Sequence, residues 1–194
     1  EVVLTTTVTG TDPLSGETVS SGPVSCTLMV LGPASLSSTA YLIQERVSTG
    51  QAVAVVFTVS NTALSKDAVN VFVGLVNRSG AMLFPVSSPP AGPYVIPGGA
   101  AQAYTWTFTA AGPGQVAFSL TATGVDSFGG GKLFTTRTVS GLVQDPAQIA
   151  SAVAVSAASL LVGKSRILTV TVTNTGEAPA VVQAPTALGA YGSG

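Results

Sequence analysis

The sequence has no histidine, one cysteine and few charged side chains. Without histidine, the usual general base of hydrolases and the commonest zinc ligand are both missing. Seven Lys and Arg residues among 194 are too few to form the basic stripe that holds a nucleic-acid backbone. We therefore expect no enzymatic activity, no cofactor or metal, and no nucleic-acid partner.

Long apolar runs are also missing. The most apolar stretch, residues 147–162, is interrupted by one Gln and three Ser and is shorter than the roughly 20 residues that cross a bilayer. We expect no membrane span. The chain begins at Glu1 with neither Met nor a signal-peptide pattern, so we expect it to be a segment of a longer protein.

The chain repeats itself. Residues 58–66 read TVSNTALSK and residues 171–179 read TVTNTGEAP, which places Asn61 and Asn174 113 positions apart. At the same spacing residues 32–51 resemble 145–164, and at a spacing of 114 residues 3–17 resemble 117–131. We infer three parts: a complete repeat over 33–145, the last two strands of a preceding repeat in 1–32, and the first three strands of a following repeat in 146–194.

Alternation of side chains predicts strands. In AYTWTFTA, Tyr104, Trp106 and Phe108 alternate with Thr, and Phe57 and Phe118 occupy the apolar positions of two similar runs. Further runs near 36–43, 68–76, 82–86 and 132–143 bring the complete repeat to about seven strands. The Ala-rich segment 147–162 would suit a helix, but its repeat partner has no helical stripe, so we expect strands in both.

These patterns predict an all-β protein of immunoglobulin-like β-sandwich repeats in tandem, with a closed barrel as the alternative. The phrases TVTVTNTGEAPA, YTWTFTAAGPGQVAFS and TVTGTDPLSGETVSS resemble bacterial tandem Ig-like surface repeats of the cell-adhesion-related and conserved-repeat types. That resemblance implies stalks, spacers, adhesive arms or fibre shafts.

The candidate site residues have predominantly structural interpretations. Asp12 and Asp126 recur at one hairpin position and favour turn capping over calcium binding, because the second copy offers a single carboxylate. Residues 129–133, GGGKL, lack the first Gly and the Ser or Thr of a phosphate loop. Asn61 and Asn174 are expected to end strands by bonding to the backbone.

Two further positions have a functional alternative. Tyr104, Trp106 and Phe108 are expected in the core together with Phe57 and Phe118, although an aromatic strip could instead bind sugar rings. Cys26 aligns with Ser140 at a spacing of 114, so we expect a small buried or half-buried side chain rather than a redox or cross-linking thiol.

We therefore predict a structural segment of an extracellular or cell-surface fibre, stalk or adhesin, whose partners are neighbouring copies of the same repeat or chain and which could assemble head-to-tail by strand complementation. The alternative is a secreted sandwich module that binds a glycan or a surface protein through the 86–100 loop or the aromatic strand. Each end must be completed by strands from outside the complete repeat, because a lone hairpin is marginally stable.

Overall fold

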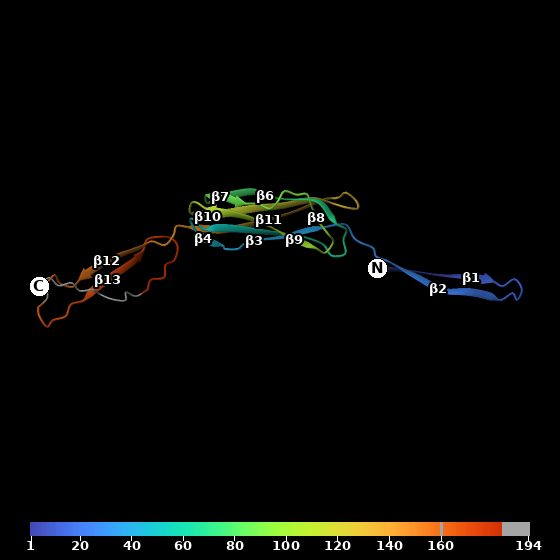
Figure 1. Cartoon of the computed structure of the whole chain (residues 1–194), viewed down its shortest axis with the longest axis horizontal. Coiled ribbons are helices and arrows are strands. Elements are labelled where there is room, and N and C mark those ends of the chain that lie inside the picture. The colour runs from blue at the N-terminus through green and yellow to red at the C-terminus, as the bar shows by residue number, and fades with distance from the viewer. Residues whose placement is uncertain (160, 184–194) are drawn as a thin grey trace.

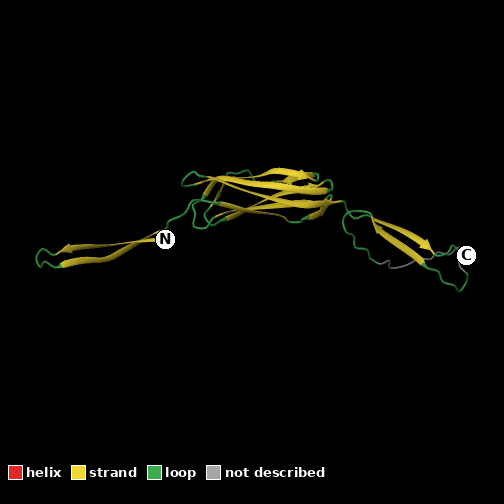
Figure 2. Ribbon diagram, turned by 180° about the vertical axis from the view of Figure 1, so that it is seen from behind, coloured by secondary structure: helices red, strands yellow, loops and turns green. Residues whose placement is uncertain are grey.

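The computed structural model describes residues 1–159 and 161–183, and over these residues the chain consists of strands and loops. Figures 1 and 2 show a central two-layered body with one long hairpin projecting from each end. No helix long and apolar enough for a membrane span occurs in the described part. The all-β prediction is confirmed.

The described residues form thirteen strands. The first hairpin comprises β1 (Val2–Thr11) and β2 (Thr18–Leu28), and the last comprises β12 (Ile149–Val155) and β13 (Leu168–Asn174). The strands of the central body are β3 (Leu36–Leu42), β4 (Arg46–Ser48), β5 (Ala52–Asn61), β6 (Ala68–Gly80), β7 (Leu83–Ser87), β8 (Tyr94–Ile96), β9 (Ala101–Ala110), β10 (Gly114–Asp126) and β11 (Lys132–Gln144).

Two sheets make up the central body. One has the order β3-β5-β9-β7 and the other the order β4-β11-β10-β6-β8. Alternate residues of both sheets point into one shared core, in which Phe57 and Phe118 are fully buried and the rings of Phe108 and Phe118 stack with their centroids 5.4 Å apart. The period-two pattern of the sequence therefore marks the buried face.

The seven longer strands of the central body lie where alternation predicts them. Two three-residue strands were not predicted: β4, which pairs in parallel with the end of β11, and β8, which pairs with β6 inside the segment 86–100. Strands this short have no periodicity to detect. The Ala-rich segment 147–162 contains β12, which confirms a strand over Ile149–Val155, and its described residues after Val155 are loop.

The β12–β13 hairpin has the same register as β3–β5. Seven Cα pairs run from Leu36 opposite Asn61 to Leu42 opposite Val55. Seven pairs, each shifted by 113 positions, run from Ile149 opposite Asn174 to Val155 opposite Leu168. The third strand expected in this part of the chain falls largely outside the described residues.

The turn of the β1–β2 hairpin has the same backbone hydrogen bonds as the turn of the β10–β11 hairpin. Asp12 N donates to Glu17 O at 2.8 Å and Gly16 N to Asp12 O at 2.8 Å, and the same two bonds recur 114 positions later around Asp126 at 2.9 and 3.0 Å. Gly16 and Gly130 have φ of 69° and 65°, which suits glycine. A β-bulge between Thr7 and Thr9 then shifts the register by one residue toward the chain start.

Candidate interaction surfaces

The β1–β2 hairpin has one apolar and one largely polar face. Its apolar face corresponds to the core-facing side of β10–β11, and Leu4 takes the place of Phe118. The opposite face includes a hydroxyl pair in which Thr5 Oγ1 and Ser25 Oγ are 2.8 Å apart. Among the described residues this hairpin is a two-stranded sheet by itself, so Leu4 is 54% exposed. The exposed large apolar side chains of the apolar face are Val2, Leu4, Val8, Val19, Val24 and Leu28, and Val3 is exposed on the opposite face.

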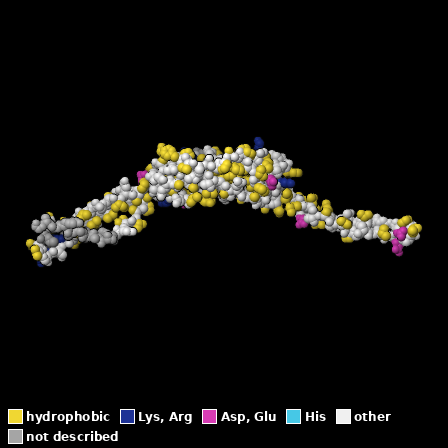
Figure 3. Space-filling model, viewed as in Figure 1, with side chains coloured by type: hydrophobic (Ala, Val, Ile, Leu, Met, Phe, Trp, Pro, Cys, Tyr) yellow, Lys and Arg dark blue, Asp and Glu magenta, His cyan; other side chains and the backbone are white. Residues whose placement is uncertain are grey.

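The β12–β13 hairpin is divided in the same way. On one face the Ala residues of β12 lie opposite the Thr residues of β13, and the other face carries mostly larger aliphatic side chains. Val170 occupies the position of Phe57 but is 43% exposed, whereas Phe57 is 0% exposed. The exposed members of this apolar face are Ile149, Val153, Val155, Leu168, Val170 and Val172. Figure 3 shows hydrophobic side chains along both hairpins and few charged groups.

Asn61 and Asn174 end their strands with matching hydrogen bonds. The side-chain oxygen of Asn61 accepts from Ser35 N at 3.1 Å, and that of Asn174 accepts from Gln148 N at 3.2 Å. Asn61 also donates to Ile96 O at 3.0 Å and is buried, because β8 covers it. Asn174 is exposed and instead accepts from Gly176 N. Within the described part of the chain, Asn61 is therefore covered by a strand and Asn174 is not.

Cys26 is exposed, so the prediction of a buried or half-buried thiol is wrong. The bulge places Cys26 opposite Leu4, just as Val139 lies opposite Phe118. Cys26 therefore takes the position of Val139 and not that of Ser140. Val139 packs against the core of the central body, but none of the described residues covers the hairpin face that carries Cys26. The thiol is therefore on the apolar face yet accessible.

The structure places all five aromatic residues of interest inside the central body. Trp106 is 8% exposed, and Phe57, Tyr104, Phe108 and Phe118 are at most 5% exposed. This excludes the aromatic strand as an exposed sugar-binding strip. Burial raises the pKa of Tyr104 to about 12, and within the described part its hydroxyl has no hydrogen-bond partner.

The two aspartates that were weighed for calcium binding bond to their own turns. Among the described residues no group of three or more His, Cys, Asp or Glu side chains lies close enough to hold an ion. Asp12 accepts from Leu14 N at 2.9 Å and from Ser15 Oγ at 2.8 Å, and these bonds lower its pKa. Asp126 accepts from Phe128 N in the corresponding position. Both carboxylates therefore cap their own turns.

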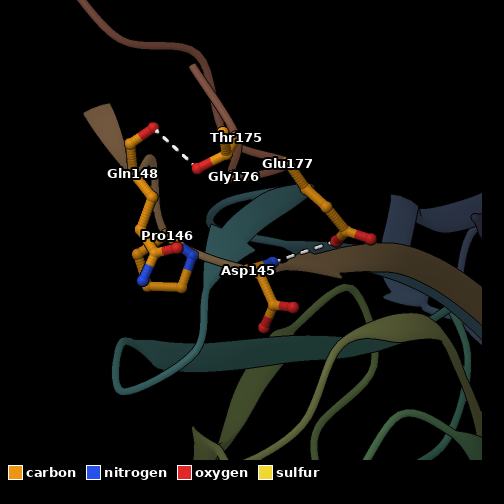
Figure 4. Close-up of a pocket in the computed structure, with 6 residues that line it drawn as sticks. All are labelled: Asp145, Pro146, Gln148, Thr175, Gly176 and Glu177. Atoms are coloured by element: carbon orange, nitrogen blue, oxygen red, sulfur yellow. Dashed lines mark hydrogen bonds between the residues drawn. The ribbon is translucent and has the colours of Figure 1, made fainter. Parts of the chain in front are cut away.

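A cleft lies where the C-terminal hairpin joins the central body (Figure 4). It is lined by Asp145, Pro146, Gln148, Thr175, Gly176 and Glu177. Glu177 Oε2 accepts from Asp145 N at 3.0 Å, while the Asp145 carboxylate points away from it. Ala178 N donates to Asp145 O at 2.9 Å. These bonds connect the two parts of the chain and do not form an acid and base pair.

The same connection occurs 113 positions earlier. Gly32 N donates to Leu64 O at 3.0 Å, just as Asp145 N donates to Glu177, and Gly32 forms a parallel bridge with Ser65. A backbone oxygen in one junction is thus replaced by a carboxylate oxygen in the other. The chain enters β3 and β12 through equivalent contacts.

The outer face of the five-stranded sheet carries a small aromatic depression. Phe72 and Phe134 flank Thr123 on the neighbouring strands and are 52% and 64% exposed. Asn70, Gly124 and Lys132 also line the depression. Alternation in the sequence could have revealed these positions, but it does not distinguish an exposed Phe from a buried one.

Comparison with known proteins shows distant similarities of fold. No family and no curated protein matches the chain. The ASH/PapD-like domain 7 of human CEP192 aligns over 55% of this chain and 86% of its own, with 11% identity and a TM-score of 0.38. A family 123 glycoside hydrolase from Clostridium perfringens aligns over 58% of this chain and 27% of its own, with 12% identity and a TM-score of 0.38.

Spo0M, a sporulation control protein from Bacillus subtilis, aligns over 58% of this chain and 50% of its own, with 15% identity and a TM-score of 0.31. At these identities and TM-scores, none of the three similarities bears on what the chain does.

Proposed function

We propose that this chain is a segment of a structural rod built from tandem immunoglobulin-like β-sandwich units, in which 33–145 is one complete unit and each end hairpin belongs to an adjoining unit. The observation that carries the proposal is the register of β12–β13, whose seven Cα pairs repeat those of β3–β5 at a spacing of 113. Two unrelated hairpins would have no reason to share spacing, register and the strand-ending Asn.

The sheet order supports the immunoglobulin-like assignment. The order β3-β5-β9-β7 opposite β11-β10-β6 corresponds to the ABED and GFC sheets of that sandwich. In this correspondence β12–β13 supplies the first two strands of the next unit, and β1–β2 supplies the last two of the preceding one. Each hairpin exposes the face that such a sandwich buries, which explains apolar rows that a self-contained hairpin would not need.

The junctions support a rod. Equivalent hydrogen bonds join Gly32 and Asp145 to the loops that follow β5 and β13, so successive units would be linked in the same way. A regular junction produces a regular spacing and orientation, as stalks and fibre shafts require. The chain has only 15 Lys, Arg, Asp and Glu side chains in 194 residues, and we place the rod outside the cell, on a surface or in a fibre.

The experiment is to complete the C-terminal unit. In an extended chain, a second copy of residues 69–145 is fused directly after Val181. Val181 stands 113 positions after Ala68, so the fused segment continues the repeat in register. We expect amide exchange of β12 and β13 to slow by orders of magnitude, because Val170 and Val172 become buried as Phe57 and Val59 are. The same extension carrying Val170→Asp should remain unprotected. Unchanged exchange in the extended chain would contradict the tandem proposal.

The aromatic depression favours a second candidate, a binding module for a glycan. Two half-exposed phenylalanine rings beside Asn70 and Lys132 could stack on a sugar ring and bond to its hydroxyls. A glycan-array screen of the wild-type chain and of Phe134→Ala tests this. A hit that Phe134→Ala abolishes while the unit stays folded would favour the module, and the absence of any hit would count against it.

A further inference from the structure

We propose that the apolar face of β12–β13 docks on the apolar face of β1–β2 of a second copy, in the arrangement that β3–β5 adopts over β10–β11 inside the central unit. This inference rests on the proposed function, because it uses the equivalence of the end hairpins with those two strand pairs. The occupant of each of these faces is then the complementary hairpin of another copy, and the copies join head-to-tail.

The central unit shows which residues would meet. Along β3 and β11, Ser38 Oγ and Thr135 Oγ1 are 2.7 Å apart in the core. Further along, a Cβ at Gly141 would lie 2.5 Å from Leu42 Cδ1, so these two positions are in direct contact. Ala40 and Val139 lie between the two contacts, and both pack against the core.

The end hairpins carry complementary residues at the equivalent positions. Ser151 and Ser21 correspond to Ser38 and Thr135, so both positions keep a hydroxyl. Ser21 lies at the bulge, where its Oγ accepts from Val8 N at 3.2 Å and donates to Gly22 O at 2.9 Å. Val155 is equivalent to Leu42, and Leu28 is equivalent to Gly141. The larger side chain of the pair is therefore on β3 in the central unit and on β2 in the end hairpins. The same exchange of size occurs in the middle of the contact, where Val153 and Cys26 replace Ala40 and Val139. The middle exchange keeps the volume between the strands approximately constant. Val155 with Leu28 is bulkier than Leu42 with Gly141, so the docked hairpins would stand farther apart at that end than β3 and β11 do.

Charge does not oppose this contact. Residues 1–31 contain three carboxylates and no Lys or Arg, whereas the loop between β12 and β13 carries Lys164 and Arg166. Lys164 corresponds to Gln51, and Glu1 corresponds to Gln115. Gln51 and Gln115 lie at the same end of the central unit, the end at which Thr49 N donates to Gln144 O. Docking would therefore bring the two cations toward Glu1. The interface is chiefly apolar, and its edges are of opposite sign.

The only cysteine provides the test. In the 194-residue chain carrying Val153→Cys, docking places the new thiol beside Cys26 of the next copy, and mild oxidation should produce a disulfide-linked ladder on a non-reducing gel. The matched control is Ala154→Cys, one residue away on the opposite face, which should cross-link no more than the wild type. Mass spectrometry should find position 153 joined to Cys26.

A second pair of variants separates docking from chance collision. Added to Val153→Cys, Leu4→Asp should abolish the ladder, and Thr5→Asp on the polar face should leave it intact. The thermal midpoint of the central unit checks that each variant is folded. Equal cross-linking by Val153→Cys and Ala154→Cys would overturn the docking, as would disulfides joining only like positions. If the ladder fails while the extended chain protects β12–β13, the docking is wrong and the tandem proposal stands; if both fail, the tandem proposal is wrong.

Discussion

Replacing Trp106 by Ala should lower the free energy of unfolding of the central unit by about 3–5 kcal/mol. Trp106 lies in the middle of β9, opposite Val55 of β5, and is 8% exposed in the shared core. Truncation removes most of an aromatic side chain and leaves a cavity that the paired strands cannot close. For a unit of about 113 residues, an unfolding entropy near 2.1 cal/mol/K per residue converts this loss into a fall in thermal midpoint of about 13–21 °C.

Differential scanning calorimetry of the full chain measures this midpoint directly. The matched control is Thr105→Ala, at an exposed position of the same strand, which should cost less than about 1 kcal/mol. The test is how much further Trp106→Ala lowers the thermal midpoint than Thr105→Ala does. If Trp106→Ala and Thr105→Ala shifted the midpoint by similar amounts, Trp106 would not lie between the sheets and the register of β9 would be wrong.

Three further predictions concern polar groups. Tyr104→Phe should raise the free energy of unfolding by about 1 kcal/mol, because it removes a buried hydroxyl that has no partner in the described part. In the wild type, Tyr104 should make the folded state less stable as the pH rises from about 10 to about 12, because the unfolded chain releases a proton that folded Tyr104 retains. Tyr104→Phe should abolish this loss. Asn61→Ala should cost about 3 kcal/mol in urea unfolding, since it orphans Ser35 N and Ile96 O, whereas Asn174→Ala should leave the central unit unchanged. Raising the salt concentration should move the thermal midpoint by less than about 4 °C, because exposed ion pairs contribute little; a larger shift would show that charge holds the unit together.

Much of the central unit could be predicted because strand formation leaves a local record. The alternation of Tyr104, Trp106 and Phe108 with Thr identifies a pleated strand and its buried face from ten residues alone. The spacing of Asn61 and Asn174 identifies equivalent strand ends without any knowledge of their neighbours. The turn residues Asp12 and Asp126 act within four residues of themselves, so their role is also local.

Other features depend on contacts between distant segments. The strands β4 and β8 are three residues long and exist because β11 and β6 offer them an edge. The aromatic depression arises where Phe72 and Phe134, 62 positions apart in the chain, flank the same Thr123. No pattern within one strand contains that information.

The sequence by itself determined which residues alternate, where strands end and that segments 113 or 114 positions apart are alike. Only the tertiary structure decided which apolar faces are covered. Phe57 and Val170 occupy the same position in the same strand pattern, yet one is 0% and the other 43% exposed. One bulge residue likewise moved Cys26 onto the apolar face. The physical reason is that periodicity is a property of the local backbone, whereas burial requires a second layer supplied by segments far away in the chain.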